Sequence, residues 1–250
     1  MSANRWPSRL GLAGGIDKDG ARAAELLAIG FGSVEFGTVT PNPEPGSHAG
    51  VRSLAARLAA LPSRERGTTR IGIGLGMQAA TPAALAAEWT RGQRESCDVA
   101  DYLSFNLSAR RYRPLPDYEH WPFLLGAFAA VAGERERSAA SSHRHVGLAL
   151  KLPLGATGEF PLLLAEAAVD AGFDAVIAVL PEDPTRIERL HALAAHLDGR
   201  SALIAVGGIR TGADVRDALD AGADGVQVHR IFAELGAHCL PMLACKDTGR

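Results

Sequence analysis

One stretch near the C-terminus restricts the fold more than any other feature of the chain. An apolar run, Ala202 to Val206, ends at Gly207-Gly208; an amphipathic helix from about Thr211 to Ala221 and a second apolar run, Gly225 to Val228, follow. This order predicts a βαβ unit with parallel strands. Glycines at a strand end let the backbone approach a ligand, and their N–H groups can hold a phosphate. A phosphate site is therefore predicted here, and a plain turn is the alternative.

The same alternation of apolar runs and helical patterns occupies the rest of the chain. The apolar runs number eight and are apolar almost throughout, which is typical of parallel strands buried on both faces. That count favours a closed barrel over an open doubly wound sheet. The sequence predicts an α/β fold, a single (β/α)8 TIM barrel over residues 1–250. The predicted strands are 10–13, 32–36, 70–75, 102–106, 146–152, 175–180, 202–206 and 225–228, and the predicted helices are 21–29, 81–93, 121–132, 159–171, 185–196 and 211–221.

Two segments do not fit this repeat. Residues 42–69 have proline and glycine punctuation followed by an alanine-leucine pattern, and we interpret them as an excursion from the barrel. Residues 133–145 are charged and rich in serine, which predicts a mobile loop. Thr81 followed by Pro82 predicts a capped helix start with proline in the first turn.

Composition excludes several classes of function. Hydrophobic residues make up 47% of the 250 residues, and the formal net charge of -2 argues against a nucleic-acid surface. No apolar run approaches the roughly 18 residues of a membrane span, and the first residues lack the apolar core of a signal peptide. Cys97, Cys239 and Cys245 show no metal-binding spacing, and an odd number suits a reducing compartment. We expect a cytoplasmic protein that binds no nucleic acid, membrane or metal.

Residues that carry chemistry in such a barrel lie where the strands end. Lys151 ends an apolar strand, where it either pairs with a carboxylate or meets an anionic ligand; we favour the ligand. On that interpretation, Lys151→Met reduces ligand affinity and changes thermal stability little. Asn106 ends another strand, and its amide has either a structural or a ligand partner. Asp17-Lys18 in the first loop is either a surface ion pair or part of the site.

Two loops concentrate positive charge near this face. Arg110, Arg111 and Arg113 lie in one loop, where a solvated basic surface is the alternative to recognition of carboxylate or phosphate. His229-Arg230 follows the last strand and faces the glycine pair if the barrel closes. An anion site is therefore predicted between the glycines and Arg230.

The motifs at these strand ends resemble those of the dihydroorotate dehydrogenases, FMN-dependent barrels of pyrimidine synthesis. GLAGGIDKDG (Gly11 to Gly20) is similar to G-L-A-A-G-F-D-K-N-G, and GFGSVEFGTVTPNPEPG (Gly30 to Gly46) to G-F-G-x-V-E-x-G-T-V-T-P-x-P-x-P-G. ADYLSFNLS (Ala100 to Ser108) resembles A-D-Y-L-x-x-N-x-S. IAVGGIRTGADVRDALDAGADGVQV (Ile204 to Val228) resembles a glycine-rich block that many phosphate-binding barrels share. The resemblance covers nearly the whole chain.

The resemblance implies FMN as cofactor and assigns roles to particular residues. Lys18 falls on a position that meets flavin and substrate, and Lys151 on one that stabilises the anion formed on flavin reduction. Lys18, Asn106 and Lys151 are the candidate catalytic residues, and Lys18, Ser108, Arg110 and Arg111 the candidate substrate contacts. The candidate cofactor contacts are Ala13, Gly14, Thr38, Asn106, Lys151, Gly207, Gly208, His229 and Arg230.

The chain departs from the family where the substrate is handled. Ala109 stands at a catalytic-base position, and Arg111 where the family has a substrate-binding asparagine. Leu180 and Gly74 stand at two further asparagine positions. Alanine cannot abstract a proton, so the usual deprotonation lacks its base. An N-R-x-G-x-N loop expected within 51–69 and a G-G-x-S-G loop after Pro181 are not found.

Three functions follow from retained pocket residues and lost substrate groups. The first is an FMN-dependent oxidoreductase acting on a small anionic substrate other than dihydroorotate. The second is a lyase or isomerase that uses the former flavin pocket for a phosphorylated or carboxylate substrate. The third is a non-catalytic partner subunit. A homodimer is one assembly open to the chain.

Overall fold

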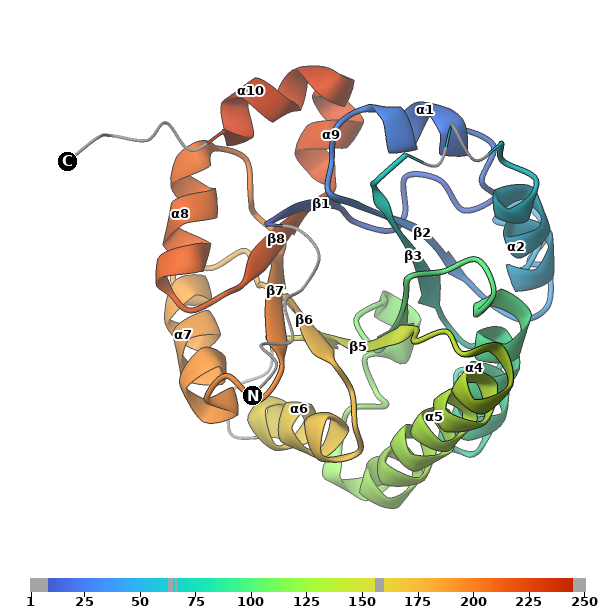
Figure 1. Ribbon diagram of the computed structural model, residues 1–250. Helices are drawn as coiled ribbons and strands as arrows, with labels where there is room; N and C mark the ends of the chain where they lie inside the picture. The colour runs from blue at the N-terminus through green and yellow to red at the C-terminus, as the bar shows by residue number, and fades with distance from the viewer. Residues whose placement is uncertain (1–8, 63–64, 66, 156–159, 245–250) are drawn as a thin grey trace.

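The computed structural model describes residues 9–62, 65, 67–155 and 160–244. Its eight strands are parallel and pair in chain order, and β8 pairs with β1 to close the barrel (Figure 1). The predicted (β/α)8 TIM barrel is confirmed. The strands are β1 (Leu10–Leu12), β2 (Ser33–Val39), β3 (Arg70–Leu75), β4 (Tyr102–Asn106), β5 (Gly147–Pro153), β6 (Ala175–Val179), β7 (Ala202–Val206) and β8 (Gly225–Val228).

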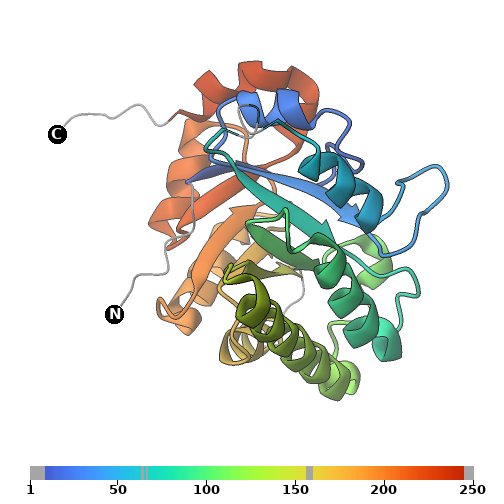
Figure 2. The same ribbon diagram turned by 45° about the vertical axis from the view of Figure 1, so that its right-hand side comes forward.

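The helices form a layer outside the ring of strands (Figures 1 and 2). Among the described residues, none of them is long and apolar enough to cross a membrane. The α-helices are α1 (Ala23–Ala28), α2 (Val51–Ala59), α4 (Leu85–Ser96), α5 (Trp121–Ser142), α6 (Phe160–Asp170), α7 (Arg186–Leu197), α8 (Gly212–Asp220), α9 (Arg230–Leu235) and α10 (Leu240–Leu243). Short 3-10 turns are η1 (Pro82–Ala84), η2 (Arg110–Tyr112), η3 (Tyr118–His120) and η4 (Gly236–Cys239).

Local sequence explains where two of the helices begin. Thr211 starts α8 with a capping box, in which its hydroxyl accepts the N–H of Asp214 and the Asp214 carboxylate accepts the N–H of Thr211. Pro82 occupies the first turn ahead of α4, as predicted, but Thr81 makes no side-chain capping bond. Pro82 opens the 3-10 turn η1, and α4 begins only at Leu85. The predicted side-chain cap at Thr81 is therefore wrong.

The barrel interior differs from one side to the other. Alternate residues of a strand point to opposite faces, so every second side chain enters the barrel. On β6 and β7 these are apolar, and Ile177 and Ile204 form a small cluster with Ala149 of β5. Lys151, two residues after Ala149 on β5, also enters the barrel. On β2 and β8 they include two buried polar residues, Glu35 and Gln227. A charge at Glu35 therefore lies inside the barrel, where it requires a partner.

Residues 133–145 are not the predicted loop, because α5 continues through most of the segment to Ser142. Glu134 and Arg135 of this helix pair with charged residues of neighbouring segments, Arg94 and Asp174. Glu134 is buried and accepts hydrogen bonds from Arg94 of α4 at 2.6 Å and from Arg137 at 2.8 Å. These guanidinium groups, led by Arg94, lower the pKa of Glu134 to about 2. The charged residues Glu134 and Arg135 thus lie where α5 packs against its neighbours.

The stretch 42–69, predicted as an excursion, has two parts. A loop with an antiparallel bridge between Glu44 and His48 follows β2 and extends past the strand ends (Figure 2). Helix α2 comes next and connects β2 to the parallel strand β3, as a crossover helix does. The loop therefore belongs to the face of the barrel that carries function in this fold.

Candidate functional site

A cavity of about 290 Å³ opens at the carboxyl ends of the strands. Its walls come from strands β5, β6, β7 and β8 and from the loops after β1, β4, β6, β7 and β8. Eight of the predicted site residues line it: Ala13, Gly14, Ser108, Lys151, Gly207, Gly208, His229 and Arg230. The other five, Lys18, Thr38, Asn106, Arg110 and Arg111, are not part of its lining.

Lys151 forms a buried ion pair at the floor of this cavity. Its Nζ lies 2.9 Å from Oε1 of Glu35, and the two side chains are 8% and 0% exposed. Gln227 donates from Nε2 to Oε2 of Glu35 at 3.4 Å and to the hydroxyl of Tyr102 at 3.1 Å. Lys151 therefore lines the cavity and also pairs with a carboxylate, although the sequence favoured a ligand alone.

Glu35 is a site residue that sequence reasoning missed. A signal was present, because Glu35 interrupts an apolar strand at a position whose neighbours Val34 and Phe36 are fully buried. A Cβ on Gly14 would lie 2.7 Å from Oε1 of Glu35, so glycine there leaves room for the carboxylate. Burial, followed by the Glu35 charge, raises the pKa of Tyr102 well above its ordinary value, so the phenol stays neutral.

Gly207 and Gly208 form the corner at the end of β7. Their φ angles are +108° and +68°, which residues with a Cβ rarely adopt. A Cβ on Gly207 would lie 2.8 Å from the carbonyl oxygen of Leu180, and one on Gly208 would overlap Arg186. Within the described chain, neither glycine N–H donates a recorded hydrogen bond. The turn alone explains both glycines, and their N–H groups remain available to an anion.

His229 and Arg230 stand at the mouth of the cavity on the loop after β8. Burial, together with the charges of Lys151 and Arg230, lowers the pKa of His229, which favours the neutral imidazole. Arg230 forms an ion pair with Glu182 across the mouth, and both of these side chains are largely exposed. An anion that binds Arg230 therefore competes with Glu182.

Asn106 is hydrogen-bonded within the protein. Its Nδ2 donates to Oγ1 of Thr38 at 2.8 Å. Its Oδ1 accepts both the N–H and the hydroxyl of Ser108 at 2.7 Å. These bonds fix the turn after β4 and aim Ser108 at the cavity. The structural partner for the buried amide is thus present, while Thr38 and Asn106 lie behind the cavity wall.

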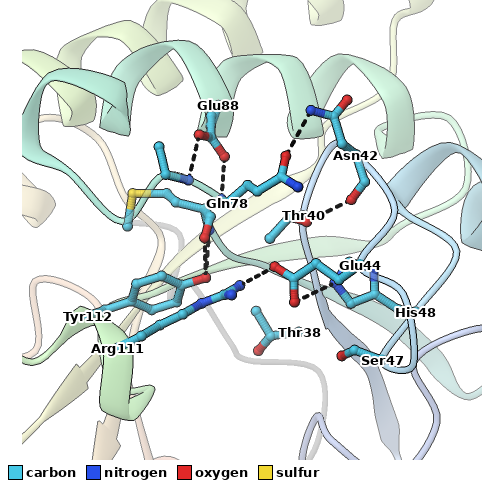
Figure 3. A network of polar contacts seen from close by, with 12 residues as sticks. Thr38, Thr40, Asn42, Glu44, Ser47, His48, Gln78, Glu88, Arg111 and Tyr112 are labelled. Carbon is cyan, nitrogen blue, oxygen red and sulfur yellow. Dashed lines mark hydrogen bonds and ion pairs between the residues drawn. The ribbon is translucent and has the colours of Figure 1, made fainter.

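Arg111 is held away from the cavity by a network between loops (Figure 3). Its Nη2 lies 2.7 Å from Oε1 of Glu44, and the guanidinium lies 5.0 Å from the ring centre of Tyr112. The Tyr112 hydroxyl donates to the carbonyl of Met77 at 2.8 Å and accepts its N–H at 2.7 Å. Glu44 also faces His48, whose Nε2 is 3.6 Å away. The network joins the loops after β2, β3 and β4.

The first loop has a structural carboxylate and a cation near the same network. Asp17 is buried, and its two oxygens accept the N–H groups of residues 19–22. Lys18 donates to Oγ of Ser47 at 3.1 Å, beside the Glu44–His48 loop. Asp17 and Lys18 therefore do not pair with each other, and the predicted alternative of a surface ion pair between them is wrong.

A second cavity of about 490 Å³ adjoins the first. The two share Ser108, Val179, Leu180 and Glu182 as lining residues. Arg113 lines the second cavity and Arg110 lines neither, and both residues are exposed. The arginines of this loop therefore have different surroundings. Arg111 holds Glu44, and Arg113, which was not among the predicted site residues, faces a cavity.

Comparison with known proteins identifies the family. No protein-family model matches the chain. It is 31% identical to a dihydroorotate dehydrogenase (quinone) of Methylococcus capsulatus, with 92% of this chain and 80% of that protein covered. It is 32% identical to that of Halorhodospira halophila, with coverage of 90% and 78%. The chain belongs to the dihydroorotate dehydrogenase family. Dihydroorotate dehydrogenases are oxidoreductases, and the chain is an enzyme of this oxidoreductase-like family.

A solved structure agrees with the family assignment and with the fold. The chain matches the ligand-free dihydroorotate dehydrogenase of Eimeria tenella with a TM-score of 0.77 at 25% identity, covering 94% of this chain and 82% of that one. The alignment with the Methylococcus relative spans 276 positions, which is more than the 250 residues of this chain. The relative therefore has segments inside the aligned region without a counterpart here.

Proposed function

We propose that the chain is an FMN-dependent oxidoreductase of the dihydroorotate dehydrogenase family that acts on a small anionic substrate other than dihydroorotate. The observation that carries the proposal is the mixture of retained and lost groups around one cavity. Lys151, Gly207 and Gly208 line it as a cation and a phosphate corner. Ala109 offers no base, and Leu180 lines the cavity without a polar side chain.

The lining residues fit a flavin in chemistry. Lys151 supplies a cation, and the free N–H groups of Gly207 and Gly208 suit a phosphate. The two adjoining cavities reach the size of ordinary cofactor and substrate sites, about 300–1,000 Å³. FMN bound there would supply hydride acceptance. Lys151 would hold the developing negative charge, and Glu35 fixes its position.

A proton acceptor is needed in place of the lost base. Ser108 lines the cavity, but its hydroxyl donates to Oδ1 of Asn106. His229 also lines it, and its lowered pKa favours a neutral imidazole that can accept a proton at neutral pH. We therefore assign His229, rather than a residue of the loop after β4, as the candidate base.

The purified protein tests the proposal through its absorbance spectrum and the mass of any molecule it releases. A flavin spectrum with FMN in the released fraction is the expected result. Dihydroorotate oxidation with a quinone or fumarate as acceptor should be slower than in an ordinary family member by about 10²–10⁴, the usual loss for a missing general base. A colourless protein that takes up no added FMN contradicts the cofactor, and normal orotate formation contradicts the change of substrate.

A further inference from the structure

The second cavity has a mostly apolar lining with a few polar groups, which is typical of small-molecule sites. Of its twelve described lining residues, nine have apolar or glycine side chains and three are polar: Ser108, Arg113 and Glu182. Phe160 forms part of the wall and is held by ring contacts with Tyr118 and Trp121, at 4.5 and 5.7 Å between centroids. The cavity is therefore mostly apolar and has one wall fixed by aromatic packing.

Charge is unevenly distributed over the three polar residues. Glu182 forms an ion pair with Arg230 of the neighbouring cavity. Ser108 donates its hydroxyl proton to Oδ1 of Asn106. No described residue forms a hydrogen bond or an ion pair with the Arg113 guanidinium. A free guanidinium beside an apolar cavity offers paired donors that match a carboxylate.

The apolar walls restrict what accompanies that carboxylate. Leu152, Leu180 and Pro181 offer no side-chain donor or acceptor to a bound molecule. A polar ring would leave its amide groups without partners, which disfavours binding. An aliphatic or aromatic body would instead replace contact with water by contact with these walls. The lining therefore fits an apolar molecule with one anionic end.

We infer that this cavity binds a small monocarboxylic acid with an apolar body, with Arg113 as its carboxylate-binding residue. The cavity shares Val179 and Leu180 with the first, so the body of the acid reaches towards the Lys151 site. This inference names the substrate class of the proposed function and rests on it for the role of the neighbouring cavity. It replaces Arg110 and Arg111 as substrate contacts.

Calorimetric titration of the full-length protein with 3-phenylpropionate tests the inference, with its uncharged amide and orotate as comparison probes. The acid should bind more tightly than either probe. Arg113→Gln should weaken binding of the acid by about tenfold or more, as expected for loss of a charge-assisted pair, and leave binding of the amide unchanged. Arg110→Gln is the matched control, because Arg110 lies in the same loop outside both cavities, and it should bind the acid normally.

Several outcomes overturn the inference. The inference is wrong if the acid does not bind, if the amide binds as well as the acid, or if the Arg113 and Arg110 variants lose equal affinity for the acid. A folding defect in Arg113→Gln is recognised because it also weakens binding of the amide; Arg113→Lys then decides, since retained charge should preserve part of the affinity. The flavin spectrum separates the two proposals. A yellow protein that ignores the acid overturns this inference alone, and a colourless protein that binds it through Arg113 overturns only the cofactor.

Discussion

The ion pair between Lys151 and Glu35 makes Lys151 important for stability as well as for binding. Lys151→Met keeps most of the side-chain stem but removes the charge that faces a fully buried carboxylate. The strand pattern alone led to the expectation that this change leaves stability nearly unaltered. The buried pair predicts the opposite, because Glu35 would remain in the barrel and, among the described residues, would keep only Gln227 as a side-chain donor, at 3.4 Å.

The size of the effect follows from the burial of both groups. Breaking a buried ion pair by removing one partner costs about 3–5 kcal/mol, because an uncompensated charge stays behind. A domain of this length loses roughly 2–4 °C in Tm for each kcal/mol. Lys151→Met should therefore lower Tm by about 6–20 °C. Adding Glu35→Gln removes the stranded charge, and the double variant should regain at least half of the loss.

Urea unfolding and thermal melts of the unmodified protein, both single variants and the double variant measure this coupling. Glu35→Gln alone should be milder than Lys151→Met, since Lys151 lines the cavity and can reach water. The melts are run with and without added FMN, so that loss of a bound ligand is separated from loss of the pair. A Tm for Lys151→Met within 2 °C of the unmodified protein would refute the reasoning. So would a double variant whose loss equals the sum of the two single losses.

Three further predictions concern other charged groups. Arg230→Ala should weaken binding of FMN or inorganic phosphate by about tenfold or more in calorimetry, and Glu182→Gln should strengthen it by releasing Arg230; equal affinities would show that the corner is only a turn. The lowered pKa of Glu134 stabilises the folded state above about pH 4.5, and this stabilisation is lost as pH falls towards 2. The loss in free energy of unfolding is about 1–3 kcal/mol, after a discount for the exposed arginine partners. Glu134→Gln should remove this part of the pH dependence, as measured by urea unfolding between pH 2 and pH 5. Burial lowers the pKa of His48, so the free energy of unfolding should fall as pH drops below about 6.5, where the unfolded chain takes up a proton more readily. His48→Gln should reduce the slope of the free energy of unfolding against pH in this range, and an unchanged slope would contradict the prediction.

The fold was largely predictable from the sequence because its signal is local and repeated. Four predicted strands, 70–75, 102–106, 202–206 and 225–228, have the bounds that the structure gives them. Each is a short apolar run ended by glycine or a polar residue, and closure into a barrel buries both faces. The main error, at 133–145, arose because charge was interpreted as solvent exposure. In the structure Glu134 is buried against Arg94, 40 residues away, and no local pattern reports such a pairing.

The sequence predicted which strand ends carry site residues, but it did not predict which side chains those residues pair with. Lys151 was found because a lysine ends an apolar strand, but its partner Glu35 is 116 residues away in sequence. Arg111 and Arg113 are two positions apart in one loop, and their composition gives no reason to prefer either. The turn η2 decides between them, because it places Arg111 against Glu44 and Arg113 beside the second cavity.

The pairing of charges across the two cavities also bears on where an anionic substrate would bind. In the first cavity Lys151 is paired with Glu35 and Arg230 with Glu182, so an incoming carboxylate must share or displace a partner at either cation. In the second cavity no described residue pairs with Arg113, so a carboxylate there displaces no described partner. A flavin phosphate carries enough charge to compete with the exposed Glu182, whereas a monocarboxylate can pair with Arg113 without displacing a carboxylate and can place its apolar body against the apolar lining of the second cavity. On the two proposals above, the first cavity therefore takes the phosphate of FMN and the second takes the carboxylate of the substrate.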